Sequence, residues 1–243
     1  MKKLRTVIQY ECSTSFKYIW LFYSIVFAVV LITAVITCIG TGSTDKSGIN
    51  GLEFNSVIYV GILGVMGFKE DFKMLIQNGF TRKYIFLSTF SLFVFVSGIM
   101  ALVDTVVGKV LHLIYDSYDS IFGGLYGYGH SVFLNWFWLF LVYMLVCCSL
   151  YLAILVINRM AKTTMIYTGV ILGLTIILVI PALVRFVLPK EFTDKVIEVL
   201  MKSMGFMTDG TINFIYPILL LVVIAGIMSI CSYYVIRRTE LKV

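Results

Sequence analysis

The chain contains six apolar runs, and most of them are long enough to cross a membrane as helices. A spanning helix needs about 20 mostly apolar residues to cross roughly 30 Å of hydrocarbon. Inside hydrocarbon the backbone must satisfy its own hydrogen bonds, which a helix does within one segment. We therefore expect an all-α polytopic membrane protein, with residues 1–243 forming a single transmembrane domain of six transmembrane helices. The expected spans are residues 18–40, 54–68, 84–104, 132–157, 164–185 and 212–236.

Composition supports this class, because 60% of the residues are hydrophobic and only 13% are charged. Soluble domains average roughly 25% charged residues. The second run is marginal, since residues 55–68 cover only about 21 Å as a helix. Either this helix extends outward past Glu53, or the segment after it sinks into the inner headgroup region.

The Lys and Arg residues divide unequally between the two sides of the membrane in this topology. One side collects both chain ends and the connections after the second and fourth spans, with 13 of the 19 Lys and Arg and four of the 13 Asp and Glu. The positive-inside rule makes that side cytoplasmic. We therefore expect a multi-pass protein with both termini in the cytoplasm. The net charge of +6 then needs no nucleic-acid partner.

Three further segments have the apolar stripe of an amphipathic helix. Residues 1–17 are expected to lie along the inner leaflet as an interfacial helix. Residues 191–205 are expected to form an amphipathic helix on the outer side. Between the second and third spans, Phe72, Leu75, Ile76 and Phe80 make one apolar stripe of a short inner helix at about 69–80. Gly79 is expected to end it, and Thr81 to cap the next helix. The alternative for this stretch is a solvated loop that obeys the positive-inside rule.

Candidate chemistry inside the membrane is sparse. Asp104 and His112 share one helix face, and we expect both at the outer rim of the third span. A proton relay is the functional alternative to a merely solvated position. No Cys or His spacing indicates a metal site. The stretch 40–47 has an Asp where a phosphate-binding loop needs its second Gly, so we expect no ATPase in this chain. We also expect no catalytic residue in it.

The layout and the segment Glu70–Lys83 resemble the membrane subunits of type-2 ABC transporters, here of a small Gram-positive bacterial exporter. The resemblance implies a permease in the bacterial cell membrane that pairs with a second copy or a sister permease. It also implies a separate ATP-binding-cassette subunit that binds ATP and Mg, with no cofactor in this chain. The inner helix would couple to that ATPase, and membrane lipid would surround the spans. The implied coupling residues are Glu70, Asp71, Phe72, Leu75, Ile76, Gln77, Phe80, Arg82 and Lys83.

The resemblance favours export of an amphipathic peptide, a toxin or a lipid. Two other classes are considered. An intramembrane enzyme would need paired catalytic groups at membrane depth, and the sequence has no HExxH motif and no paired mid-span Asp. A non-transporting membrane sensor or immunity protein that binds a peptide or lipid stays the alternative.

Overall fold

The computed structural model describes residues 2–41, 51–69, 71–114, 118–179, 181 and 189–238. Within these residues the secondary structure is helical, apart from one isolated bridge between Phe206 and Ile212, so the expected all-α class is confirmed for them. The elements are α1 (Lys2–Thr41), α2 (Glu53–Lys69), α3 (Asp71–Gln77), α4 (Arg82–Ile114), α5 (Ile121–Tyr126), α6 (Val132–Arg159), α7 (Lys162–Leu174), the π-helical segment η1 (Thr175–Val179), α9 (Lys190–Ser203) and α10 (Ile215–Arg237).

Four helices of the described part are long and apolar enough to cross a membrane, namely α1, α4, α6 and α10. They indicate a multi-pass membrane protein, but the expectation of six spans is wrong for these residues. The expected second span is α2, whose 17 residues extend about 26 Å. The expected fifth span, 164–185, corresponds to α7 and the π-helical segment, and residues 180 and 182–188 lie outside the described part.

The π-helical segment Thr175–Val179 ends two residues before Pro181. Proline has no N–H to donate, and its ring crowds the carbonyl one turn earlier. A local widening from α to π geometry is one way in which a helix accommodates such a disruption. The regular α-helix therefore ends at Leu174.

The first helix is continuous, which contradicts the expected division into an interfacial helix at 1–17 and a span at 18–40. α1 runs over 40 residues, about 60 Å, or twice the hydrocarbon thickness. The sequence contains neither Gly nor Pro between Lys2 and Ile39. Because nothing in the backbone favours a break, the helix continues through the change from polar to apolar residues.

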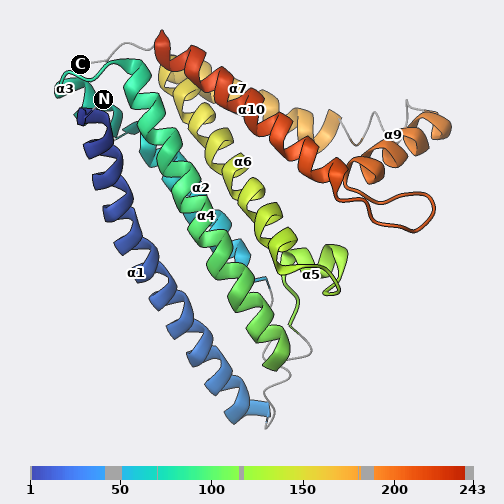
Figure 1. Cartoon of the computed structure of the whole chain (residues 1–243). Coiled ribbons are helices and arrows are strands. Elements are labelled where there is room, and N and C mark those ends of the chain that lie inside the picture. The colour runs from blue at the N-terminus through green and yellow to red at the C-terminus, as the bar shows by residue number, and fades with distance from the viewer. Residues whose placement is uncertain are drawn as a thin grey trace.

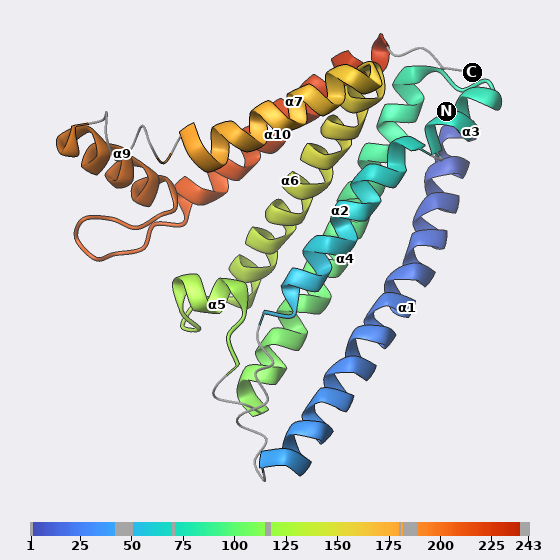
Figure 2. The same cartoon turned by 180° about the vertical axis from the view of Figure 1, so that it is seen from behind.

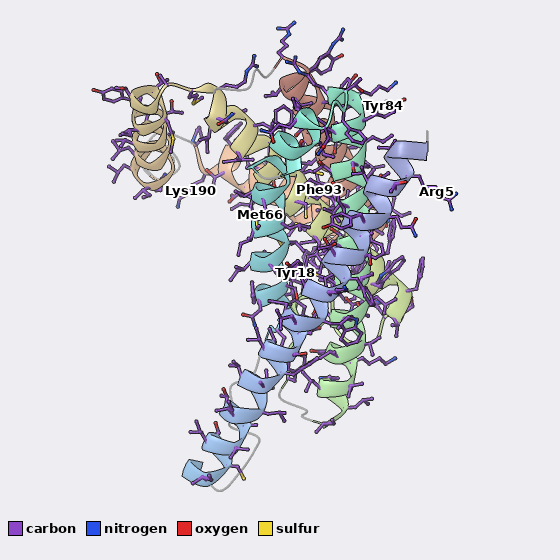
Figure 3. The ribbon with its side chains drawn as sticks, turned by 90° about the vertical axis from the view of Figure 1, so that its left-hand side faces the viewer. Arg5, Tyr18, Met66, Tyr84, Phe93 and Lys190 are labelled. Atoms are coloured by element: carbon purple, nitrogen blue, oxygen red, sulfur yellow. The ribbon has the colours of Figure 1, made fainter. Side chains whose placement is uncertain are left out.

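α6 is the central helix of the bundle, since it packs against α2, α4 and α10. Figures 1 and 2 show α4, α6 and α10 close together at the end that carries α3, with α10 diverging from α4 towards the opposite end. α1 packs against α4, and Figure 3 shows its far half swinging away from the bundle. We call the end that carries α3 the basic end, defined by Arg5, Arg82, Lys83, Arg159, Arg237 and Arg238. The opposite end, with α5 and the end of α4, is the far end.

α2 and α6 approach so closely that their contact requires glycine. A Cβ atom on Gly64 would lie 2.8 Å from the carbonyl oxygen of Cys147, and one on Gly61 would lie 2.9 Å from the Leu150 side chain. Small residues allow this kind of backbone approach between membrane helices. Gly67, three residues further on, faces Thr89 and Phe93 of α4, so the glycines of α2 serve helix packing.

α9 lies outside the bundle, whereas α5 contributes Phe122 and Tyr126 to the hydrophobic core. α9 confirms the amphipathic helix expected at 191–205, and none of its residues is buried. Figure 3 shows Lys190, at its start, well away from the packed interior around Phe93. The sequence did not predict α5, a six-residue helix capped by the Ser120 hydroxyl, which accepts from the Gly123 N–H.

Candidate functional site

The short helix α3 is held between α2 and α4 at the basic end. Phe72 and Leu75 are each 2% exposed and belong to the hydrophobic core of the chain. Ile76 and Phe80 are half-buried against the same core, whereas Gln77 is exposed. One edge of α3 is therefore anchored in the bundle, and the other faces outward.

Gly79 ends α3 as the sequence predicts. Its φ of 76° lies in the left-handed region that glycine adopts without strain. The Phe80 N–H donates to the Leu75 carbonyl at 3.0 Å, and the Gly79 N–H donates to the Ile76 carbonyl at 2.9 Å. These two bonds form a Schellman motif, which fixes the direction in which the chain leaves the helix. Thr81 then directly precedes α4, and its carbonyl accepts from the Ile85 N–H.

The residues of the implied coupling set thus occupy different environments. Glu70 lies outside the described residues, as does the side chain of Asp71. Phe72 and Leu75, which the resemblance implies as residues that couple to the ATPase, fill space in the core of this chain. Burial of apolar surface is non-directional, so the stripe alone does not distinguish the two destinations.

Two arginines join the ends of three helices at the basic end. The Arg82 Nη1 donates to the Arg237 carbonyl at 2.6 Å, and the Arg159 Nη2 donates to the Arg238 carbonyl at 3.1 Å. The last carbonyls of a helix have no partner within it, and they carry its negative partial charge. The guanidinium groups at the start of α4 and the end of α6 satisfy those of α10. Lys83, beside them, is exposed.

Asp104 occupies a buried polar cluster, although we expected it at a solvated rim. Its side chain is only 5% exposed. The Tyr23 hydroxyl donates to its Oδ1 at 2.8 Å, and the Tyr143 hydroxyl donates to its Oδ2 at 2.6 Å. Ser56 Oγ lies 3.4 Å from the Tyr23 hydroxyl. Side chains from α1 and α6 therefore meet at the carboxyl group on α4, and Ser56 of α2 contacts Tyr23 beside it.

A second carboxyl group, that of Glu53, is buried near this cluster. Glu53 is 1% exposed at the start of α2 and lies close to Gly108 and Tyr118. Burial, and then the charge of Glu53, raise the pKa of Tyr118 well above its usual value. The Tyr118 hydroxyl therefore stays protonated at neutral pH and is able to donate towards the carboxyl group.

A third buried acid, Glu11, bridges α1 and α4 near the basic end. Glu11 is 7% exposed, and the Ser88 hydroxyl donates to its Oε2 at 2.6 Å. The sequence places Glu11 in the expected interfacial helix and gives it no partner.

His112 lies at the far end, away from the Asp104 carboxyl group, although both belong to α4. Its Nδ1 lies 3.1 Å from the Tyr118 carbonyl, which only accepts, so Nδ1 carries the proton. Its ring stacks on Tyr128 with centroids 3.5 Å apart. The shared helix face did not bring Asp104 and His112 into one site.

Comparison with known proteins adds no family to this class of multi-pass helical membrane protein. No family model, no curated protein and no solved structure matches the chain.

Proposed function

We propose that this chain is the permease subunit of an ATP-driven ABC exporter in a bacterial cell membrane. In this proposal α3 receives movement from a separate ATP-binding-cassette ATPase, which binds ATP and Mg. The chain would form a translocation path for an amphipathic peptide, a toxin or a lipid, together with a second copy or a sister permease.

The observation that carries the proposal is the one-sided anchoring of α3. Phe72 and Leu75 fix one edge in the core between α2 and α4, while Gln77 is exposed at the other edge. The Schellman bonds at Gly79 connect the end of α3 rigidly to α4. A force applied to the exposed edge would therefore be passed to two packed helices. In this scheme Phe72 and Leu75 transmit the movement, and Gln77 and its neighbours contact the ATPase.

The charge distribution supports the orientation that this role requires. The six residues that define the basic end come from the ends of α1, α4, α6 and α10, and Figure 1 shows these helix ends on the side of the bundle that carries α3. The positive-inside rule then assigns α3 and both chain ends to the cytoplasm. A cytoplasmic ATPase would meet α3 at that surface.

The exposed apolar surface supports a second membrane subunit. Large apolar side chains are exposed along the far half of α1, including Ile32 at 59% and Ile36 at 64%. Similar exposure continues along α7 and α10. Lipid covers such surface in a monomer, whereas a permease pair would enclose a path with part of it.

The test uses the tagged full-length chain, purified in a mild detergent from the cells that naturally make it. The wild-type preparation is expected to carry ATPase activity that vanadate inhibits. Gln77→Trp places a bulky ring on the exposed edge of α3, and it should reduce that activity at least severalfold. Gln9→Trp is the matched control, since Gln9 is also exposed on α1 near the same end.

A folded wild-type preparation without vanadate-sensitive ATPase activity would contradict the exporter proposal. It would favour the sensor or immunity protein instead. Equal effects of Gln77→Trp and Gln9→Trp would remove α3 from the coupling role. Substitution of Phe72 is a poor test of partner binding, because its burial makes loss of folding the first consequence.

A further inference from the structure

A cavity of about 200 Å³ lies at the far end, between the last turns of α4, the segment around α5 and the first turns of α6. This volume would hold several water molecules, at about 30 Å³ each, but it is small for a drug-sized ligand. It suits a compact polar group. Six of its lining residues carry the argument that follows, namely Thr105, Lys109, His112, Tyr128, His130 and Asn135.

One wall of the cavity is held in place by converging hydrogen bonds. The Tyr118 carbonyl accepts from the Tyr128 hydroxyl at 2.8 Å and from His112 Nδ1 at 3.1 Å. The Tyr128 hydroxyl in turn accepts from the Ser120 N–H at 2.7 Å. The rings of His112 and Tyr128 stack within 4° of parallel. Because these groups are already ordered, a ligand would bind without the entropic cost of arranging them.

The charge of the lining favours an anion. Lys109 contributes an ammonium group, and none of the described lining residues is Asp or Glu. His130 Nε2 lies 3.0 Å from the Tyr126 carbonyl, which only accepts, so Nε2 carries a proton. An anionic group near Lys109 would gain a charge-assisted hydrogen bond in a partly enclosed space.

Two buried polar atoms of the lining residues have no hydrogen-bond partner within the described part of the chain. They are the Thr105 hydroxyl oxygen and the Asn135 amide oxygen. Buried polar groups in native proteins nearly always have a partner, so these two atoms indicate one that comes from outside the chain. Each accepts a hydrogen bond, and Thr105 also donates one. A ligand with hydroxyl groups would satisfy both.

The border of the cavity is apolar and belongs to helices that span the membrane. Leu113, near the end of α4, is 75% exposed, and Val132, at the start of α6, is 39% exposed. A ligand that carries acyl chains would place them along these side chains while its polar part entered the cavity. A free soluble ligand would leave them without a partner.

We propose that this cavity binds the headgroup of an anionic phospholipid whose headgroup carries hydroxyl groups. The phosphate accepts from Lys109, and the headgroup hydroxyls donate to Thr105 and Asn135. The acyl chains extend past Leu113 and Val132 into the leaflet at the far end. This site is independent of the coupling role of α3, and its test does not require an ATPase.

The test measures lipid binding to the full-length protein in detergent by native mass spectrometry. The probes are phosphatidylglycerol, phosphatidylcholine and soluble glycerol 3-phosphate. Phosphatidylglycerol is expected to bind at least tenfold more tightly than the other two. Lys109→Gln should weaken its binding roughly tenfold, or about 1.4 kcal/mol, because it removes the charge-assisted hydrogen bond to the phosphate. Lys109 is exposed, so this variant should fold normally.

Two further variants complete the design. Lys195→Gln removes an exposed lysine on α9, outside the cavity, and should leave phosphatidylglycerol binding unchanged. Asn135→Leu should weaken binding severalfold at an unchanged melting temperature, and Asn135→Ser replaces it if that temperature falls. Equal binding of the two lipids, or equal effects of Lys109→Gln and Lys195→Gln, would overturn the site. Equally tight binding of glycerol 3-phosphate would overturn the assignment to a membrane lipid.

Discussion

The two ends of the bundle differ in how completely their helices are joined. At the basic end, Phe72 and Leu75 anchor α3, and Arg82 and Arg159 bond to the last carbonyls of α10. At the far end, α10 diverges from α4 and the far half of α1 leaves the bundle. The basic end is a joint. The far end is open between α1 and the other helices, whereas the rings of Phe122, Tyr126 and Phe214 still join α5 to the start of α10 there.

This difference indicates where movement is small and where it is large. Helices that are joined at one end and separate at the other can rotate about the joint, so a small displacement there becomes larger at the open end. Under the proposed function, the ATPase would act on α3 next to the joint. The path for cargo would open at the far end beside α1, whose far half exposes apolar side chains such as Ile32 and Ile36.

The largest expected difference between the two ends is in the stability of two phenylalanine variants. Phe72→Ala should lower the free energy of unfolding by about 3–5 kcal/mol, because it leaves a cavity in the joint. Phe133→Ala, at the start of α6, should change it by less than about 0.5 kcal/mol, since Phe133 is 69% exposed. Thermal unfolding in detergent compares them. Similar shifts in melting temperature for both variants would mean that the joint is no more ordered than the open end.

The next expected effect concerns the cluster that connects α1 to the centre of the bundle. Asp104→Ala leaves the hydroxyls of Tyr23 and Tyr143 buried without their acceptor, which should cost about 3 kcal/mol. Asp104→Asn should cost less, because its amide oxygen still accepts. Val106→Ala, on the exposed side of the same helix, is the control. Thermal unfolding in detergent tests this prediction. An Asp104→Ala variant with the melting temperature of wild type would show that the carboxyl group is not needed to hold α1.

Local sequence signals predicted the elements whose ends depend on nearby residues. The apolar runs located α6 and α10 to within a few residues, and the amphipathic pattern located α9. The end of α3 at Gly79 was also predicted, because a glycine in the left-handed conformation ends a helix without the help of distant residues. These features depend on residues within one or two turns.

Features that depend on distant partners were not predicted. Asp104 bonds to Tyr23 and Tyr143, which lie 81 and 39 residues away, so its own helix gives no sign of them. For the same reason, the stripe on α3 showed that Phe72 would be buried without showing by what. The continuity of α1 was not predicted for another reason. The change from polar to apolar residues was taken for the end of one helix and the start of the next, although no Gly or Pro interrupts the helix there.

A smaller effect is expected where Arg82 bonds to the end of α10. Arg82→Gln removes the 2.6 Å bond to the Arg237 carbonyl, and for a half-buried arginine this should cost about 1 kcal/mol. The last turn of α10 should then exchange its amide hydrogens faster, while the turns of α6 near Asn135 stay unchanged. Lys83→Gln serves as the control because Lys83 is exposed. Unchanged exchange at Val235 and Ile236 in the Arg82 variant would mean that the arginine does not hold the helices together.

The smallest effect is expected on α9, which has no buried residue. Leu200→Ser changes a side chain that is 58% exposed, so the melting temperature in detergent should move by no more than that of Phe133→Ala. In a lipid nanodisc, the apolar face of α9 is expected to rest on the bilayer, and the same substitution should then weaken that contact. The measurement is the melting temperature of the variant relative to wild type in each environment. A large fall in melting temperature in detergent would show that α9 packs on the protein. The far end would then be more closed than the structure indicates.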